Sequence, residues 1–78
     1  MKTYYFDIEH NRTIMRDEEG SDHTSEASAR RELYETLLEI LRHGAKDFGC
    51  AAHVDGVLRD AKREIWRGRL SLRLERAR

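Results

Sequence analysis

The sequence of 78 residues carries 15 basic and 15 acidic side chains, a formal net charge of zero and a single cysteine. This length allows one small domain over residues 1–78, and one cysteine excludes an intrachain disulfide framework, so we expect Cys50 to be a buried free thiol. Because no secretory segment and no apolar run of membrane-spanning length is present, we expect a cytoplasmic protein with no membrane partner.

The first predicted element is a hairpin, because side chains over residues 3–9 alternate as they do in a half-buried strand. Residues 10–12 supply its turn, since Asn11 tolerates positive φ. The return strand is expected over about residues 13–17, with Ile14 against the core. The inward side chains of the first strand are Tyr4, Phe6 and Ile8, and the outward ones are Tyr5, Asp7 and Glu9.

Three consecutive acids precede Gly20 in the stretch RDEEGSDH, which raises the question of a metal site. A hard cation needs several converging oxygen ligands, and a calcium loop of the EF-hand type places acids at positions one, three and five before its glycine. If Gly20 were that glycine, Met15 would occupy position one. We therefore interpret the stretch as a solvated turn before a helix. The acids considered as ligands are Asp17, Glu18, Glu19 and Asp22.

An amphipathic helix is predicted over about residues 25–47, where apolar side chains recur at spacings of three and four. Ser25 or Thr24 is expected to cap its first turn, because a side-chain oxygen there accepts a hydrogen bond from an unpaired amide. The helix is expected to end at Gly44 or one turn later at Gly49.

The apolar stripe of this helix is wider than a short four-stranded sheet covers. Its members are Leu33, Tyr34, Leu37, Leu38, Ile40 and Leu41. We expect the margin formed by Tyr34, Leu38 and Leu41 to be an interaction surface for a second copy or another protein partner. The alternative is that the whole stripe belongs to the intramolecular core.

The C-terminal run RGRLSLRLER predicts a strand, because its side chains alternate between two faces. One face has Leu70, Leu72 and Leu74, and the other has Arg69, Ser71 and Arg73. Residues 54–66 fit two structures. Val54, Leu58 and Ile65 would share a helix face, whereas Gly56 and the polar run RDAKRE are typical of a strand that ends in a turn. Periodicity does not decide between the two.

Four stretches bear on that choice: YYFDI, RDEEG, SEASARREL and REIWRGRLSLRLER, in this order from about residue 3 to residue 75. Together they resemble a family of short bacterial proteins, the domain of unknown function 6894 family. The resemblance implies a hairpin, a helix and a second hairpin, and it implies no activity. It favours strand and turn over residues 54–66, although family members commonly have an Asp-x-x-Gly turn where this chain has RDAKRE. The matching positions are Asp17, Glu18, Glu19, Gly20, Ala29, Arg30 and Arg31.

Cys50 and His53 have the spacing of a zinc ligand pair, but one pair supplies only half of a tetrahedral site. Nothing in the sequence places His23 or His43 beside them. As a nucleophile and base they would also need an orienting group, an oxyanion donor and a cleft. We therefore expect no catalytic residues, no metal and no cofactor.

Three arginines, Arg67, Arg69 and Arg73, would form a row at intervals of roughly 7 Å on one strand face, close to phosphate spacing along a nucleic acid. Residues 1–49 hold 7 basic and 11 acidic residues, whereas residues 50–78 hold 8 and 4. The basic half therefore meets either an anionic partner or the acidic half of the same chain.

The intramolecular alternative is favoured for the arginine row. Asp7 and Glu9 point outward on the first strand and are expected to pair with the arginines across the sheet. Tyr5 and Trp66 are the candidate stacking platforms for bases, but Trp66 falls in register with the inward leucines and is expected in the core.

These observations predict an α+β fold: a single small ββαββ domain with one amphipathic helix packed on a four-stranded, mostly antiparallel sheet. The predicted function is that of a non-catalytic protein-interaction or self-association module, expected as a homo-oligomer such as a dimer. The alternative is a nucleic-acid-binding module that uses the arginine-lined strand face.

Overall fold

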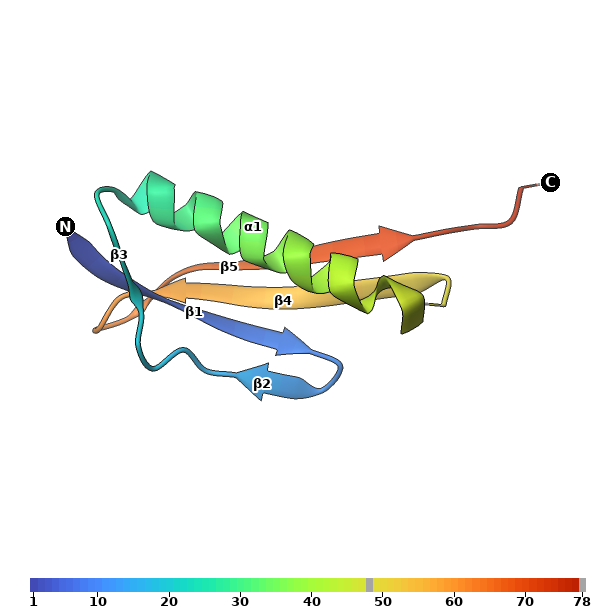
Figure 1. Ribbon diagram of the computed structural model, residues 1–78, viewed down its shortest axis with the longest axis horizontal. Helices are drawn as coiled ribbons and strands as arrows, with labels where there is room; N and C mark the ends of the chain where they lie inside the picture. The colour runs from blue at the N-terminus through green and yellow to red at the C-terminus, as the bar shows by residue number, and fades with distance from the viewer. Residues whose placement is uncertain (48, 78) are drawn as a thin grey trace.

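The computed structural model describes residues 1–47 and 49–77 and shows one helix across one face of an antiparallel sheet (Figure 1). The main sheet has the strand order β2-β1-β4-β5, and β3 pairs with the first residues of β1. The predicted α+β fold is confirmed, with β3 as a fifth strand beside the expected four. The elements are β1 (Lys2–His10), β2 (Thr13–Met15), β3 (Ser21–His23), α1 (Glu26–Gly44), the 3-10 turn η1 (Ala45–Asp47), β4 (Ala51–Arg59) and β5 (Glu64–Arg73).

The first hairpin turns through Asn11 and Arg12, whose φ angles are 51° and 65°. Both residues are left-handed, as the two-residue turn that matches strand twist requires. The return strand β2 ends at Met15, two residues earlier than expected. Ile14 is 72% exposed, so its predicted place in the core is wrong: it pairs with Glu9, whose side chain lies on the sheet face away from α1.

α1 begins after Ser25, whose hydroxyl accepts a hydrogen bond from the Ser28 N–H at 3.1 Å. Ser25 is one of the two predicted caps, and Gly44 is the earlier of the two predicted ends. No helix within the described residues is long and apolar enough to cross a membrane.

The core lies between α1 and the sheet. Leu41 is only 4% exposed, so its prediction as part of an interaction surface is wrong: the α1 face that it shares with Leu33 and Leu37 points to the sheet. Cys50 is exposed, so the predicted buried thiol is also wrong, because Cys50 lies beyond the end of α1 where the chain enters β4. The buried core residues are Tyr4, Phe6, Ile8, Ala29, Leu33, Leu37, Leu41, Val54 and Leu58.

Residues 54–66 form the end of β4, a turn and the start of β5, so the strand alternative is confirmed and the helical one is wrong. The turn closes without a glycine because the Asp60 carboxylate accepts the N–H groups of Lys62 at 2.8 Å and Arg63 at 2.9 Å. The Asp60 N–H donates to the Arg63 carbonyl at 3.0 Å, and Lys2 contributes an ion pair to Asp60 at 3.2 Å.

Acid is expected to weaken this turn. The amides of Lys62 and Arg63, together with the Lys2 ammonium, lower the pKa of Asp60 to about 2. A carboxyl group whose pKa is lower in the folded state than in the unfolded state stabilises the fold at any pH above its unfolded-state pKa of about 4. This stabilisation is lost as the pH falls through the folded-state pKa. We therefore expect the thermal midpoint to fall between about pH 4 and pH 2. Melts followed by circular dichroism measure this. The fall should be shallower in Asp60→Asn, which keeps an acceptor oxygen but no charge, and an identical slope would contradict the assignment.

Candidate functional site

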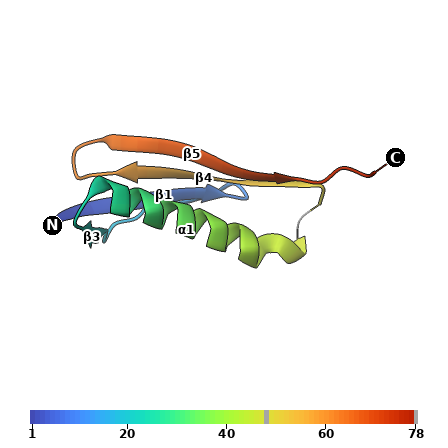
Figure 2. The ribbon, with the colours of Figure 1, turned by 90° about the horizontal axis from the view of Figure 1, so that it is seen from above.

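The two faces of the sheet differ in cover, because α1 lies on one face and, within residues 1–47 and 49–77, no helix lies on the opposite face (Figure 2). On the open face a row crosses three strands, since Asp7 pairs with Val57 and Val57 pairs with Arg67. The next row along the strands is Glu9, Asp55 and Arg69. Acidic and basic side chains therefore lie close together on this face.

The predicted arginine row lies on this open face of β5, and each arginine forms an ion pair within the chain. In chain order Arg67, Arg69 and Arg73 bind Glu64 at 2.8 Å, Asp55 at 2.7 Å and Glu75 at 3.2 Å. The pair with Asp55 is two-pronged, and the hydrogen bond from Arg69 lowers the pKa of Asp55. The row is thus locally neutralised, as expected.

The predicted pairing of this row with Asp7 is wrong, and Glu9 forms no ion pair with the row within the described residues. Asp55 is the main cause of the raised pKa of Arg69, and the charge of Glu9 only adds to it. Asp7 and Glu9 lie on β1, and β4 separates β1 from β5 in the sheet. The acid that reaches Arg69 is therefore Asp55 of β4, whereas Asp7 binds Arg59, also on β4.

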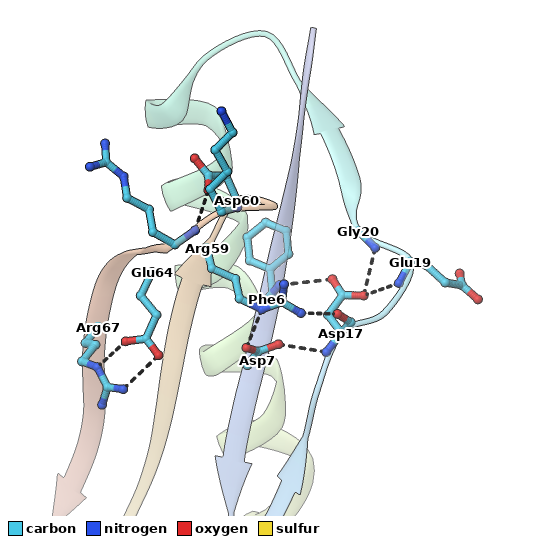
Figure 3. A network of polar contacts seen from close by, with 11 residues as sticks. Phe6, Asp7, Asp17, Glu19, Gly20, Arg59, Asp60, Glu64 and Arg67 are labelled. Atoms are coloured by element: carbon cyan, nitrogen blue, oxygen red, sulfur yellow. Dashed lines mark hydrogen bonds and ion pairs between the residues drawn. The ribbon is translucent and has the colours of Figure 1, made fainter.

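Arg59 ties three parts of the chain together (Figure 3). Its Nε donates to Asp7 at 2.8 Å, its Nη2 donates to the Asp17 carbonyl at 2.6 Å, and its guanidinium lies 4.5 Å from the centre of the Tyr5 ring. The Arg59 and Asp7 side chains are only 15% and 16% exposed. Burial opposes ionisation of Asp7, but hydrogen bonds from Arg59 and from the Asp17 N–H outweigh it and lower the pKa of Asp7. Tyr5 is thereby covered and is not a free stacking platform.

The acidic stretch before α1 is a backbone turn held by Asp17 (Figure 3). Its carboxylate accepts the N–H groups of Phe6 at 3.1 Å, Glu19 at 3.2 Å and Gly20 at 3.0 Å. Burial opposes ionisation, but these amides, Gly20 first, lower the pKa of Asp17. Within residues 1–47 and 49–77, no group of three or more His, Cys, Asp or Glu side chains is placed to hold a metal ion. The Asp17 carboxylate is thus occupied by the three backbone N–H groups from which it accepts hydrogen bonds, and it holds the turn closed.

Cys50 and His53 do not form a joint site. Residues three positions apart on an extended chain point to opposite faces of a sheet. Cys50 is exposed beside the start of β4, and His53 lies 3.9 Å from Asp55 on the open face. This geometry does not supply the nucleophile and base pair considered from the sequence.

A groove lies between α1 and β5 on the helix side of the sheet, and we call it the α1–β5 groove. Tyr34 and Leu38 are each 57% exposed at its α1 side, and Trp66 is 44% exposed on β5. Large apolar side chains are therefore open to solvent along one side of the domain. The residues that line the groove are Arg30, Leu33, Tyr34, Leu37, Leu38, Trp66, Arg67, Gly68, Arg69 and Leu70.

Two glycines that face each other across β4 and β5 explain why this groove exists. A Cβ at Gly56 of β4 would lie 2.9 Å from Leu33 Cδ1 and 3.0 Å from Leu37 Cδ2, so α1 packs directly on β4. A Cβ at Gly68 of β5 would meet nothing within 4 Å. The helix therefore covers β4 and leaves β5 open.

Trp66 lies at the start of the groove, and its predicted burial in the core is wrong. The ring is on the helix face of β5, but α1 does not cover it. Its Nε1 donates to Glu26 at 3.1 Å and the Arg30 guanidinium lies over the ring, 5.2 Å from its centre, so two polar side chains of α1 contact it without burying it. One signal in the sequence points to this opening: Gly68 stands at an inward position between Trp66 and Leu70.

Comparison with curated proteins and with solved structures found no match. The family model described as domain of unknown function (DUF6894) matches residues 3–71, which includes all of the long strands except Lys2 of β1 and the last two residues of β5. The matched range contains the Asp17 to Gly20 turn, the start of α1 and Arg59. The chain belongs to the domain of unknown function 6894 family, as its sequence resemblance implied.

Proposed function

We propose that this domain is a non-catalytic protein-association module whose contact surface is the α1–β5 groove with the adjoining edge of β5. The observation that carries the proposal is the exposure of Tyr34, Leu38 and Trp66 together with Leu72, which is 54% exposed on the same face of β5. Scattered apolar side chains on a surface need no explanation, but a continuous apolar groove marks an interaction site.

The nature of the groove supports association rather than chemistry. Its lining is mostly apolar and aromatic, with the Arg30 guanidinium at its edge beside Trp66, whereas the side chains of Arg67 and Arg69 point to the other face of the sheet. Among the described residues, the lining contains no acid, no histidine and no hydroxyl group other than the Tyr34 phenol. An aromatic and aliphatic centre with a charged rim is the usual composition of a protein interface.

The nucleic-acid alternative has weaker support. Arg67, Arg69 and Arg73 would have to leave Glu64, Asp55 and Glu75 to bind phosphates. The same acids would repel a phosphate backbone at close range. The arginine row therefore fits a compensated sheet face better than an anion-binding one.

Site-specific photo-crosslinking in the native cell tests the proposal. A photo-reactive amino acid in place of Tyr34 is expected to give protein adducts, because this side chain lies in the groove. The matched control places it at Ile14, another exposed large hydrophobic residue, which is 72% exposed but on the opposite face. Adducts at Tyr34 and few at Ile14 support the proposal. No adducts at Tyr34, or equal yields at both positions, would refute it.

A further inference from the structure

We infer that the partner at the α1–β5 groove is a second copy of this chain, with the two β5 strands paired antiparallel across a two-fold axis. This inference rests on the proposed association function and identifies its partner. The pairing joins the two sheets into one and brings the two grooves together over the seam.

The outer side of β5 is an open strand edge in the described part of the chain, because β5 ends the strand order. The Leu74 N–H donates to the carbonyl of Cys50 at 2.7 Å, and these two residues lie opposite in the register of β4 and β5. Since bonded and non-bonded pairs alternate along an antiparallel ladder, even-numbered residues of β5 bond to β4. The N–H and C=O groups of the odd-numbered residues, from 67 to 73, therefore point to the open edge.

This edge is long as well as open. β5 has 10 residues, whereas β2 at the other end of the strand order has 3. A long open edge is a template for another extended strand, and proteins that keep such an edge monomeric cover it, interrupt it or line it with charged side chains. Beyond Glu64 at its start, the charged side chains of β5 are its arginines, and each of them has an acidic partner in its own chain. β5 contains no proline, and its one bulge lies at its start, beside Leu58 and Arg59 of β4. The remaining edge is regular enough to pair.

The sequence of β5 is complementary to itself in the antiparallel direction. The N–H and C=O groups that point to the open edge in one copy must face the same kind of groups in the other copy. Odd-numbered residues of one β5 therefore lie opposite odd-numbered residues of the other β5, and even-numbered residues lie opposite even-numbered ones. Residues that are directly opposite share a face. Each register of this kind therefore places apolar or small residues against each other on the helix side. These residues are Trp66, Gly68, Leu70 and Leu72.

The spacing of the two helices fits the same arrangement. In the joined sheet the two β4 strands lie three strand spacings apart, about 14 Å. Each α1 packs over its own β4 through Leu33 and Leu37. The axes of two helices in direct contact lie about 8 to 10 Å apart, which is less than the separation of about 14 Å between the two β4 strands. The gap left between the two α1 helices therefore has about the width of one layer of side chains. Tyr34, Leu38 and Trp66 of each copy lie where this layer is needed.

Charge opposes the pairing only weakly. The chain has a formal net charge of zero, so two copies have no long-range repulsion. Arg67, Arg69 and Arg73 lie on the open face of the seam, and each already has an acidic partner in its own chain. A like-charge contact between the two β5 strands is therefore partly compensated before it forms.

Sedimentation velocity of the purified chain, with Ser71→Pro and Ser71→Ala as a matched pair, tests the inference. The Ser71 N–H points to the open edge, so proline removes a hydrogen bond of the dimer and none within the monomer. The two-fold axis repeats the loss, and at about tenfold for each bond the dissociation constant of the dimer is expected to rise roughly 100-fold. Ser71→Ala keeps the N–H and is expected to dimerise like the wild type.

A wild-type chain that is monomeric up to millimolar concentration would overturn the inference. A folded Ser71→Pro chain that dimerises as tightly as Ser71→Ala would overturn the β5 geometry. If the proline variant fails to fold, amide exchange of the wild type decides: the N–H groups of Arg69 and Ser71 should be protected only at concentrations that give the dimer. A monomer whose Tyr34 position still crosslinks another protein would refute the second copy and leave the association function standing, whereas a monomer without crosslinks would refute both.

Discussion

Replacing Arg59 with alanine is expected to lower the free energy of unfolding by about 2 to 3 kcal/mol, because the change removes the partner of a largely buried carboxylate. Asp7 would lose its ion pair at 2.8 Å, the Asp17 carbonyl would lose its donor at 2.6 Å, and Tyr5 would lose the guanidinium over its ring. In a domain of this size such a loss corresponds to a fall in the thermal midpoint of roughly 10 to 20 °C. Chemical denaturation followed by circular dichroism measures it.

Two variants separate this network from ordinary surface charge. Arg59→Lys keeps the charge but not the fork of donors, so an intermediate loss is expected. Arg69→Ala removes an equally short pair to Asp55, but the Arg69 side chain is 59% exposed, so only a small change is expected. The difference between Arg59→Ala and wild type should also shrink as the pH falls through the lowered pKa of Asp7, since a protonated carboxyl no longer needs the arginine. Equal losses in Arg59→Ala and Arg69→Ala would contradict the buried network.

The parts of the fold that were predicted correctly depend on local rules. Asn11 adopts the positive φ of a tight turn between two strands whose side chains alternate, and Ser25 caps the helix that follows it directly. Neither feature depends on residues far away in the sequence. Residues 54–66 could not be assigned from periodicity because Val54 and Leu58 fit one helix face and also fit the inward side of a strand. The difference is made by the Asp60 turn, in which the carboxylate accepts the N–H groups of its near neighbours Lys62 and Arg63, and by pairing with β1, which lies far away in the sequence.

The site depends even more on non-local placement. Exposure of Tyr34 and Leu38 was predicted correctly, but Leu41 is buried because α1 lies over β4, and that position is set by Gly56. The acids that pair with the arginines could be predicted only from the order of the strands in the sheet, and the alternation of side chains along one strand does not reveal that order. Trp66 was misplaced for the same reason, since facing the helix side of a sheet gives burial only where the helix covers that strand.

The turn that carries the acidic stretch should fail when its glycine acquires a side chain, and Gly20→Ala is expected to lower the free energy of unfolding by about 3 kcal/mol. Gly20 has a φ of 75°, and a Cβ there would lie 2.9 Å from the Tyr4 carbonyl oxygen and 2.7 Å from Thr3 Cγ2. The backbone cannot yield without breaking the hydrogen bonds that Asp17 accepts or the pairing of β3 with β1. The matched control is Gly49→Ala, because a Cβ at Gly49 meets nothing within 4 Å. Urea denaturation of both variants should show the loss in Gly20→Ala alone, with faster amide exchange over β3. Equal stability of the two variants would mean that the glycine after the acids is not required by the fold.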